Sequence, residues 1–387
     1  MSTYQVNKTY EEINAKIAAG QAVVVTAEEI IDIAQKEGVV EAARKVDVVT
    51  TGTFAPMCSS GAFINIGQSK PVIRTTKTWF NNVEAYSSIA AVDCYIGATA
   101  VAENDPLNKY HPGEFNYGGG HVIQDLVAGK KVHLRAESYG TDCYPNLAIE
   151  KTVTLNDLPN AMLVNPRNAY QNYNCAINRA DKTKYTYMGT LKPNMRNANY
   201  STSGCLSPLF NDPYLKTIGL GTRIFLGGAQ GYVTWTGTQH KKDVDRGLNG
   251  VPLSGAGTLC VMGDLKQMSP EWLVGQSIRG YGVSLSVGLG IPIPILNEEM
   301  LKYTSVSDEE IFTQIIDYGH DYPTGNTKSY GQVSYAELKS GTIKIKGEDV
   351  PTVPLSSMVK ARKIADILKS EIQKSRFFIG VPQQLFC

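Results

Sequence analysis

The middle of the chain, roughly residues 90–290, constrains the fold most, because it repeatedly interrupts short apolar runs with Gly, Asn, Tyr and Pro. Four of these runs are AAVDCYIGATA, KKVHLRAESYG, GTRIFLGGAQGYVTWTG and GAGTLCVMGDL. Such runs predict strands, and the residues between them predict tight loops. The region therefore predicts many short strands, more than a plain repeat of strand, helix and strand would contain.

The N-terminal segment predicts helices that precede a buried strand. Thr9 with Glu12, and Thr26 with Glu29, have the spacing of capping boxes at helix starts. A further helical segment, VVEAARK, leads into VDVVTTGT, whose β-branched residues are typical of a buried strand. In an α/β architecture, functional residues are expected in the loop after such a strand.

The C-terminal portion returns to helical patterns. Ser307 with Glu310 predicts the cap of a helix over EEIFTQIIDYG, and SSMVKARKIADILKSEIQK predicts a long amphipathic helix. No internal repeat or change of composition marks a second domain. We therefore expect one α/β domain over residues 1–387. Its mixed sheet would have flanking helices, many short strands in the middle and a long C-terminal helix.

The charge balance excludes some classes of partner. Lys and Arg number 37 against 36 Asp and Glu, which leaves a net charge of +1 with no basic block. Nucleic acid and anionic membranes are therefore not expected as partners. The start, MSTYQVNKTYEEI, has no apolar secretory segment, and the most apolar stretch, GVSLSVGLGIPIPIL, is too short and too broken to span a bilayer. We expect a cytoplasmic protein.

The chain contains seven cysteines, at positions 58, 94, 143, 175, 205, 260 and 387. Their odd number and wide spacing argue against a disulfide framework, a zinc knuckle or a ferredoxin-type cluster motif. Cys94 and Cys260 lie inside apolar runs and are expected in the core. Cys205, in the small-residue segment STSGCLSPLF, is a candidate metal or sulfur ligand. A site built from distant cysteines remains open.

Cys58 lies in GTFAPMCSSGAFINIG, directly after the predicted strand. Cysteine attacks as a thiolate, and a turn rich in backbone N–H groups stabilises that charge. Pro56 and Gly61 favour such a turn, and the hydroxyls of Ser59 and Ser60 are able to hydrogen-bond a sulfur anion. A small buried structural thiol is the other interpretation, and this segment alone leaves both open.

Cys143, in ESYGTDCYPN, also follows a predicted strand. Two thiols at strand ends can meet across one cleft, where they can pass sulfur or form a transient disulfide. The nearby carboxylates of Glu137 and Asp142 count against a thiolate at Cys143 unless Arg or Lys offsets them.

Two histidines are candidates for acid–base chemistry. His121 follows three glycines in YGGGHVIQDLVAGK, and His240 ends the turn sequence TGTQH. A glycine-rich turn before a helix favours anions, but the spacing of a dinucleotide or P-loop motif is missing, so a nucleotide interpretation is weak. A lone histidine more often caps a helix or binds a buried carbonyl group than takes part in catalysis.

Recognition of an amino acid needs a cation for its carboxylate and an acid for its ammonium group. The candidates are Arg167, Lys192, Arg223 and Asp212, each of which also has an ordinary surface-charge interpretation. The Asn- and Tyr-rich segment over residues 165–200 is either a solvent loop or the polar wall of a ligand site.

The chain resembles the homocysteine biosynthesis family, formerly a domain of unknown function and typified by archaeal L-aspartate semialdehyde sulfurtransferases. The resemblance covers nearly the whole chain. It rests on VDVVTTGTFAPMCSSGAFINIG, AAVDCYIGAT, YGGGHVIQDLVAGKKVHLRAESYGTDCYP, NPRNAYQNYN, YTYMGTLKPN, GTRIFLGGAQGYVTWTGTQH and GDLKQMSPEWL. It implies transfer of sulfur from sulfide or a persulfide donor to the aldehyde carbon of L-aspartate semialdehyde, and hence a role in methionine biosynthesis. Two electrons from a ferredoxin-like protein would then yield L-homocysteine.

The resemblance also implies roles for residues. The family's two functional cysteines fall at Cys58 and Cys143, the latter bearing a persulfide. The proximity of His121 and His240 to these motifs, and not the resemblance, is the basis for expecting one of them to protonate the leaving oxygen. In an alternative arrangement, Cys58, Cys143 and Cys205 hold a [4Fe-4S] cluster. Family members commonly carry C-terminal CBS domains, and we expect neither these nor a ferredoxin domain here. An electron or sulfur carrier, a binding protein for an amino-acid-like ligand, and a homo-oligomer remain open.

Overall fold

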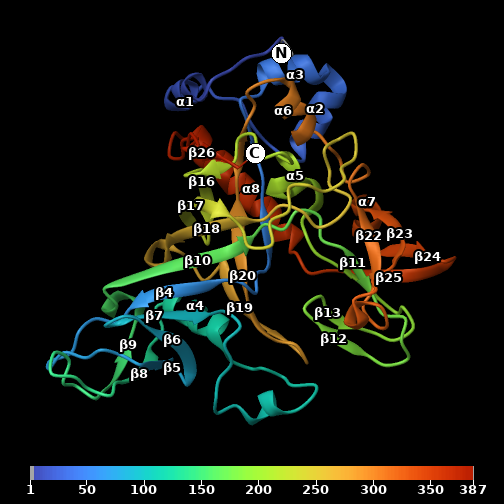
Figure 1. Ribbon diagram of the computed structural model, residues 1–387. Coiled ribbons are helices and arrows are strands. Elements are labelled where there is room, and N and C mark those ends of the chain that lie inside the picture. Colours follow the sequence, from blue (N-terminus) through green and yellow to red (C-terminus); the bar gives the residue numbers. More distant parts are fainter. Residues whose placement is uncertain (1–3, 387) are drawn as a thin grey trace.

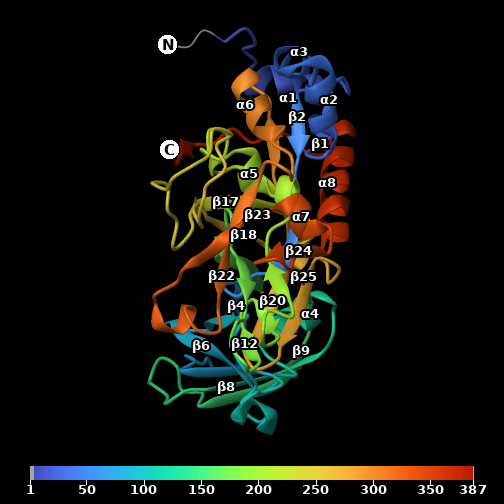
Figure 2. The same ribbon diagram turned by 90° about the vertical axis from the view of Figure 1, so that its right-hand side faces the viewer.

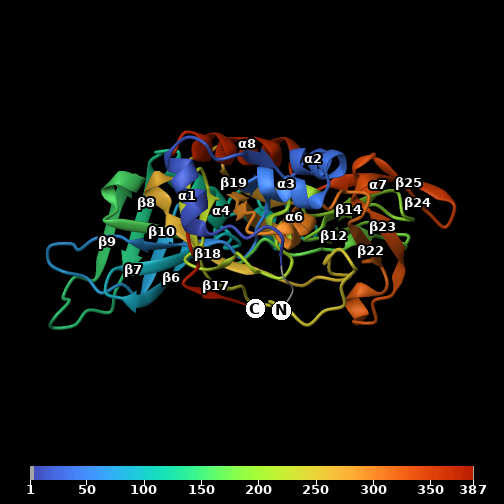
Figure 3. The same ribbon diagram turned by 90° about the horizontal axis from the view of Figure 1, so that it is seen from above.

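The computed structural model describes residues 4–386 (Figure 1). Its helices are α1 (Tyr10–Ala18), α2 (Glu29–Glu37), α3 (Val39–Lys45), α4 (Gly119–Val127), α5 (Pro208–Asn211), α6 (Glu298–Thr304), α7 (Tyr335–Lys339) and α8 (Met358–Gln373). The long C-terminal helix predicted from the sequence is α8, which confirms that prediction. In Figures 2 and 3, α8 runs along one side of the molecule, beside the N-terminal helices.

The largest sheet has thirteen strands. In spatial order they are β19 (Leu273–Ile278), β20 (Gly282–Gly290), β16 (Arg223–Leu226), β17 (Ala229–Thr236), β18 (Leu259–Asp264), β10 (Asn160–Asn168), β4 (Gly61–Asn65), β7 (Asp93–Gly97), β6 (Val83–Ala90), β5 (Lys77–Phe80), β8 (Val132–Glu137) and β9 (Ala148–Val153), with β3 (Thr53–Pro56) paired to β20. All its pairs are antiparallel, so short connections suffice between neighbours. Most of the short strands predicted from the middle of the chain belong to this sheet.

The remaining strands form smaller sheets. The six-stranded sheet, on the right in Figure 1, contains β23 (Ser329–Ser334), β22 (Phe312–Asp317), β11 (Cys175–Ile177), β14 (Ala198–Tyr200), β25 (Glu348–Pro354) and β24 (Thr342–Ile345). The others are β1 (Val24–Thr26), β2 (Val48–Thr50) and β21 (Pro292–Pro294) in one sheet, β12 (Lys184–Thr186) with β13 (Gly189–Leu191), and β15 (Gly219–Leu220) with β26 (Gln384–Leu385). Parallel pairs such as β1–β2 and β11–β22 make the architecture a mixed α/β one, as predicted.

The N-terminal predictions hold in detail. Thr9 and Glu12 form a complete capping box at α1, and Thr26 and Glu29 exchange the same two hydrogen bonds before α2. The strand predicted in VDVVTTGT is divided into β2 and β3 by Gly52. A Cβ atom on Gly52 would lie 2.1 Å from the carbonyl oxygen of Ala361 in α8, so only glycine allows α8 to pack this closely.

One helix prediction is wrong. The segment after Ser307 and Glu310 forms β22, although the Ser307 N–H does donate to the Glu310 carboxylate (2.9 Å). In β22 the buried residues alternate, and the strand pairs with β11 and β23. Pairing with distant strands therefore outweighs the local cap signal.

Two further features bear on the site. The largest cluster of buried apolar side chains runs from Val6 to Ala365 and so draws on segments near both ends of the chain. Within residues 4–386, no helix combines the length and the apolar character that a bilayer crossing requires.

Candidate active site

Cys58 lies in the turn between β3 and β4 and is half-buried. The turn is tight, because the Ser60 N–H donates to the Met57 carbonyl group (2.9 Å). At one end β3 pairs with β20, and at the other β4 pairs with β10. Cys58 is therefore fixed at a junction between two parts of the large sheet.

Two side chains at the start of β20 interact with the Cys58 thiol: Ser284 on the strand and Tyr281 directly before it. The Ser284 hydroxyl donates to the Cys58 sulfur (3.3 Å). Burial, together with the nearby Cys58 sulfur, raises the pKa of Tyr281 to about 12. Tyr281 therefore keeps its proton at neutral pH, and neutral hydroxyl groups beside a sulfur stabilise its thiolate form.

The hydroxyls expected to hold the sulfur have other partners. Ser59 donates to the Asn165 side chain (3.0 Å) and to the Arg167 carbonyl group (3.1 Å), while Ser60 accepts from Asn165 (2.8 Å). These bonds tie the turn to β10. The prediction that Ser59 and Ser60 hold the sulfur is therefore wrong: the hydroxyl group that donates to it belongs to Ser284, from a strand far along the chain.

Cys58 lines a cavity of about 150 Å³. Arg167 is the one charged side chain among the described residues that line it. The wall otherwise consists of apolar groups, hydroxyl groups and aromatic rings, the tyrosines being Tyr170, Tyr173 and Tyr187. Because these come from the Asn- and Tyr-rich segment, its interpretation as the polar wall of a ligand site is the one supported here.

A network of tyrosine hydroxyls stiffens this wall. Tyr187 hydrogen-bonds Tyr318 and Tyr322 (2.9 Å each), and Tyr318 donates to Asn174 (2.9 Å). Burial raises the pKa of Tyr187 far above its usual range and that of Tyr173 to about 12. These tyrosines are therefore polar but uncharged at neutral pH.

Ser356 shows that the cavity suits a polar ligand. Its side chain is buried and lines the cavity, yet its hydroxyl oxygen has no hydrogen-bond partner among residues 4–386. Leaving a buried polar group unpaired costs about 1–3 kcal/mol. A ligand atom that bonded Ser356 would offset this cost.

Cys143 does not share this cavity. It is exposed in the loop between β8 and β9, where Thr141 and Tyr144 exchange backbone hydrogen bonds (3.0 Å each). Figure 1 shows β8 and β9 at the lower left, at one end of the large sheet. Four antiparallel steps separate β8 from β4, so the two strands run in the same direction.

This topology separates the two thiols within one chain. Cys58 precedes the start of β4, whereas Cys143 follows the end of β8, which places them at opposite edges of the sheet. Four strand spacings add about 19 Å along the sheet. The expected meeting of the two cysteines across one cleft does not occur in this chain, and the role of Cys143 stays a prediction.

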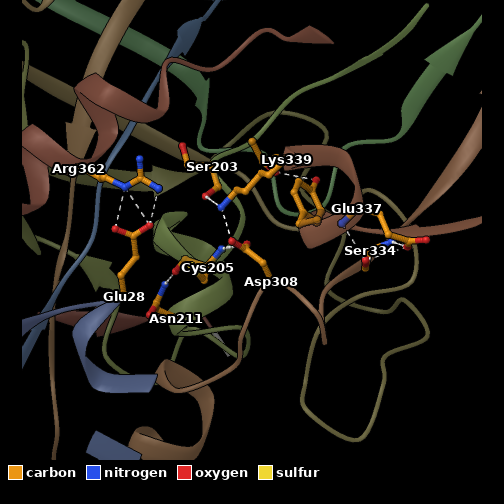
Figure 4. Close-up of polar contacts among 11 residues, drawn as sticks. Glu28, Ser203, Cys205, Asn211, Asp308, Ser334, Glu337, Lys339 and Arg362 are labelled. Carbon is orange, nitrogen blue, oxygen red and sulfur yellow. Dashed lines mark hydrogen bonds and ion pairs between the residues drawn. The ribbon is translucent and has the colours of Figure 1, made fainter. Parts of the chain in front are cut away.

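The third thiol of the alternative cluster, Cys205, is buried elsewhere (Figure 4). Its backbone N–H donates to Asp308 (2.9 Å), which pairs with Lys339. Burial raises the pKa of the Cys205 thiol to about 12, whereas an iron ligand must be a thiolate. Across residues 4–386, no three His, Cys, Asp or Glu side chains form a group that could hold a metal ion. Cys58, Cys143 and Cys205 therefore do not fit a [4Fe-4S] cluster in this chain.

Neither histidine lines the Cys58 cavity. His121, on α4, stacks on Tyr117 (5.5 Å between ring centres) and lies 3.4 Å from the Ser277 hydroxyl, and burial lowers its pKa. His240 accepts the Thr258 N–H at Nδ1 (3.0 Å) and faces a second cavity. Their proposed acid–base roles have no support from this geometry.

Of the amino-acid-binding candidates, only Arg167 lines the Cys58 cavity. Lys192 is exposed after β13, and Arg223 is half-buried on β16. Asp212 is fully buried and accepts the N–H groups of Lys216, Thr217 and Ile218. Burial raises the pKa of Asp212, and its role is to hold this turn.

Sequence reasoning missed Tyr281, Ser284 and Ser356. A signal for Ser284 existed, because serines alternate with apolar residues in GVSLSVGLG and a buried strand has little reason to carry them. No local signal marks Tyr281 or Ser356, since tertiary packing brings Tyr281 to the Cys58 sulfur and Ser356 to the cavity wall.

Comparisons with a family model and with individual known proteins point to the same family. The family model described as homocysteine biosynthesis enzyme, sulfur-incorporation, matches residues 22–379. The L-aspartate semialdehyde sulfurtransferase of Methanosarcina acetivorans is 50% identical over 380 residues, 97% of this chain and 71% of that protein. The enzyme of the same name from Methanocaldococcus jannaschii is 47% identical over 96% of this chain and 72% of its own length. No solved structure matches the chain.

Proposed function

Because this chain belongs to the homocysteine biosynthesis enzyme family, we propose that it is an L-aspartate semialdehyde sulfurtransferase. The product would be L-homocysteine. High identity over nearly the whole chain to two enzymes of that name supports the proposal. The structural observation that carries it is a cysteine and an arginine in one small polar cavity, Cys58 and Arg167.

The cavity has the groups that this substrate needs. Its volume of about 150 Å³ suits one small amino acid. The Arg167 guanidinium would bind the α-carboxylate, because arginine forms paired, charge-assisted hydrogen bonds with carboxylates. The oxygens and ring faces of Tyr170, Tyr173 and Tyr187 would receive the ammonium group in place of an acid. The aldehyde would then face Cys58.

The reaction balances with an external reductant. A sulfide-level sulfur adds to the aldehyde carbon, and loss of one water gives a carbon–sulfur double bond. Two electrons and two protons reduce that bond to the thiol. A sulfur that arrives as a persulfide needs two further electrons and protons, because its sulfur–sulfur bond must also be broken. We propose a ferredoxin-like protein as the electron donor.

In this scheme Cys58 presents the sulfur to the aldehyde, and Ser284 and Tyr281 stabilise its anionic form. Cys143 would load sulfur as a persulfide on the surface. Attack of the Cys58 thiolate on the outer sulfur of that persulfide then transfers it, leaving Cys143 as a thiolate. Because the thiols of one chain lie at opposite edges of the sheet, we propose that Cys143 of a second copy delivers the sulfur.

The decisive assay measures homocysteine formed from aspartate semialdehyde, sulfide and a strong chemical reductant. Wild-type protein should form it, and Cys58→Ala should not. Cys260→Ala is the matched control, because this thiol is also half-buried but lies outside the cavity. Wild-type protein that forms no homocysteine, or Cys58→Ala protein with full activity, would overturn the proposal.

The delivery step has its own test. An equimolar mixture of Cys58→Ala and Cys143→Ala proteins, supplied with a persulfide donor, should recover activity if sulfur passes between copies. Each variant alone should remain inactive with that donor. A mixture no more active than its components would contradict transfer between copies.

A further inference from the structure

A second cavity, of about 560 Å³, lies behind the wall of the Cys58 cavity. The two cavities share a wall at two places in the chain. Tyr170 and Gln239 line the first cavity, and the residues that directly follow them, Gln171 and His240, line the second. The long connection over residues 237–258 contributes much of the second lining and contains neither helix nor strand. Connections of this length in a compact protein usually have a function.

The second cavity carries excess positive charge. Its lining has four cations, Lys216, Lys241, Lys242 and Arg246, and two carboxylates, Glu299 and Asp243, which leaves a net charge of +2. Glu299 already pairs with Lys216 and accepts from the Tyr4 and Tyr303 hydroxyls. Among the described residues, no carboxylate pairs with Lys241, Lys242 or Arg246.

Contacts within the protein already hold the Arg246 side chain in place without a ligand. Its guanidinium lies over the Tyr214 ring (5.1 Å) and donates to the Gly250 carbonyl group (3.0 Å) and to Gln171 (3.3 Å). A half-buried cation without a counter-ion loses hydration, and burial correspondingly lowers the pKa of Arg246. An anion in the cavity would restore that lost stabilisation.

We propose that this cavity binds a small phosphorylated molecule. Two lysines and an arginine that line one concave space match the several charged oxygens of a phosphate group. The volume leaves room for more than a single phosphate, and a concave site of this size suits a small molecule.

The test is calorimetric titration of the full chain with pyrophosphate, ATP and, as a carboxylate comparison, citrate. Pyrophosphate or ATP should bind with one site per chain. Arg246→Gln should weaken binding about tenfold, as expected for loss of a charged hydrogen bond. Lys241→Ser/Lys242→Ser should also weaken it at least tenfold, and this variant keeps the fold intact because both lysines are exposed.

The control is Lys109→Ser/Lys182→Ser, which removes two exposed lysines that line neither cavity and should bind like the wild type. No binding by either phosphorylated probe, equal binding by the lysine variant, or tighter binding of citrate would overturn the proposal. None of these readings depends on sulfurtransferase activity, so they are independent of the function proposed above.

Discussion

Cys58 and Cys143 each sit in the first loop after a strand, yet the fold gives them opposite surroundings. Cys58 is half-buried, accepts a hydrogen bond from Ser284 and shares a cavity with Arg167. Cys143 is exposed in a loop, inside a turn that is closed by the backbone hydrogen bonds between Thr141 and Tyr144. The difference arises because β3 leads into the middle of the large sheet, whereas β8 lies next to its end.

The contrast suggests a division of labour. A half-buried, hydrogen-bonded sulfur that shares a cavity with a cation suits reaction with a bound substrate from which water is excluded. An exposed thiol suits exchange with a sulfur donor of any size, because access limits thiol exchange.

The largest expected effect separates the two thiols by sulfur source. With free sulfide, Cys58→Ala should lower the rate of homocysteine formation about 1,000-fold, a typical effect of losing an essential nucleophile. Cys143→Ala should retain most activity with sulfide and lose it with a persulfide donor, because only that donor needs the loading thiol. Equal losses with both sulfur sources would remove the distinction between the two roles.

The next effect concerns the cation beside Cys58. Arg167→Gln should raise KM for aspartate semialdehyde about 30- to 100-fold, because a charged hydrogen bond to the α-carboxylate is worth about 2–3 kcal/mol. Lys192→Gln, at a position outside the cavity, should leave KM unchanged. An unchanged KM in Arg167→Gln would show that the carboxylate binds elsewhere.

The smallest effect concerns the hydroxyl groups that face the sulfur. Ser284→Ala and Tyr281→Phe should each slow alkylation of Cys58 by iodoacetamide about threefold to tenfold, because each removes about 1 kcal/mol of thiolate stabilisation. Alkylation of Cys143 in the same samples should not change. Parallel slowing at both cysteines would indicate a general disturbance of the fold.

The sequence predicts the local features of this fold, and the predictions that fail are those that depend on contacts between distant parts of the chain. The capping boxes at α1 and α2, the strands around Gly52 and the helix α8 are local features, so their patterns predict them. Cys58 was identifiable as a candidate because its turn is also local. The strand β22 was missed because its pairing partners, β11 and β23, overrule a local helix cap.

The same cause explains the errors at the site. The neighbours of the Cys58 sulfur, Ser284 and Tyr281, come from more than two hundred residues away along the chain. Whether Cys143 meets Cys58 depends on strand order and direction, since an even number of antiparallel steps places the two loops at opposite edges. A pattern read along one chain contains no information on that order.

The most direct test of the central claim is substrate protection. Cysteines of the wild-type protein are alkylated with iodoacetamide at pH 8, with and without saturating aspartate semialdehyde, and quantified by peptide mass spectrometry. The substrate should protect Cys58, while Cys143 should react at an unchanged rate. Cys205, with a thiol pKa of about 12, should stay unmodified in both samples. Protection of Cys143 with unchanged alkylation of Cys58 would contradict the account.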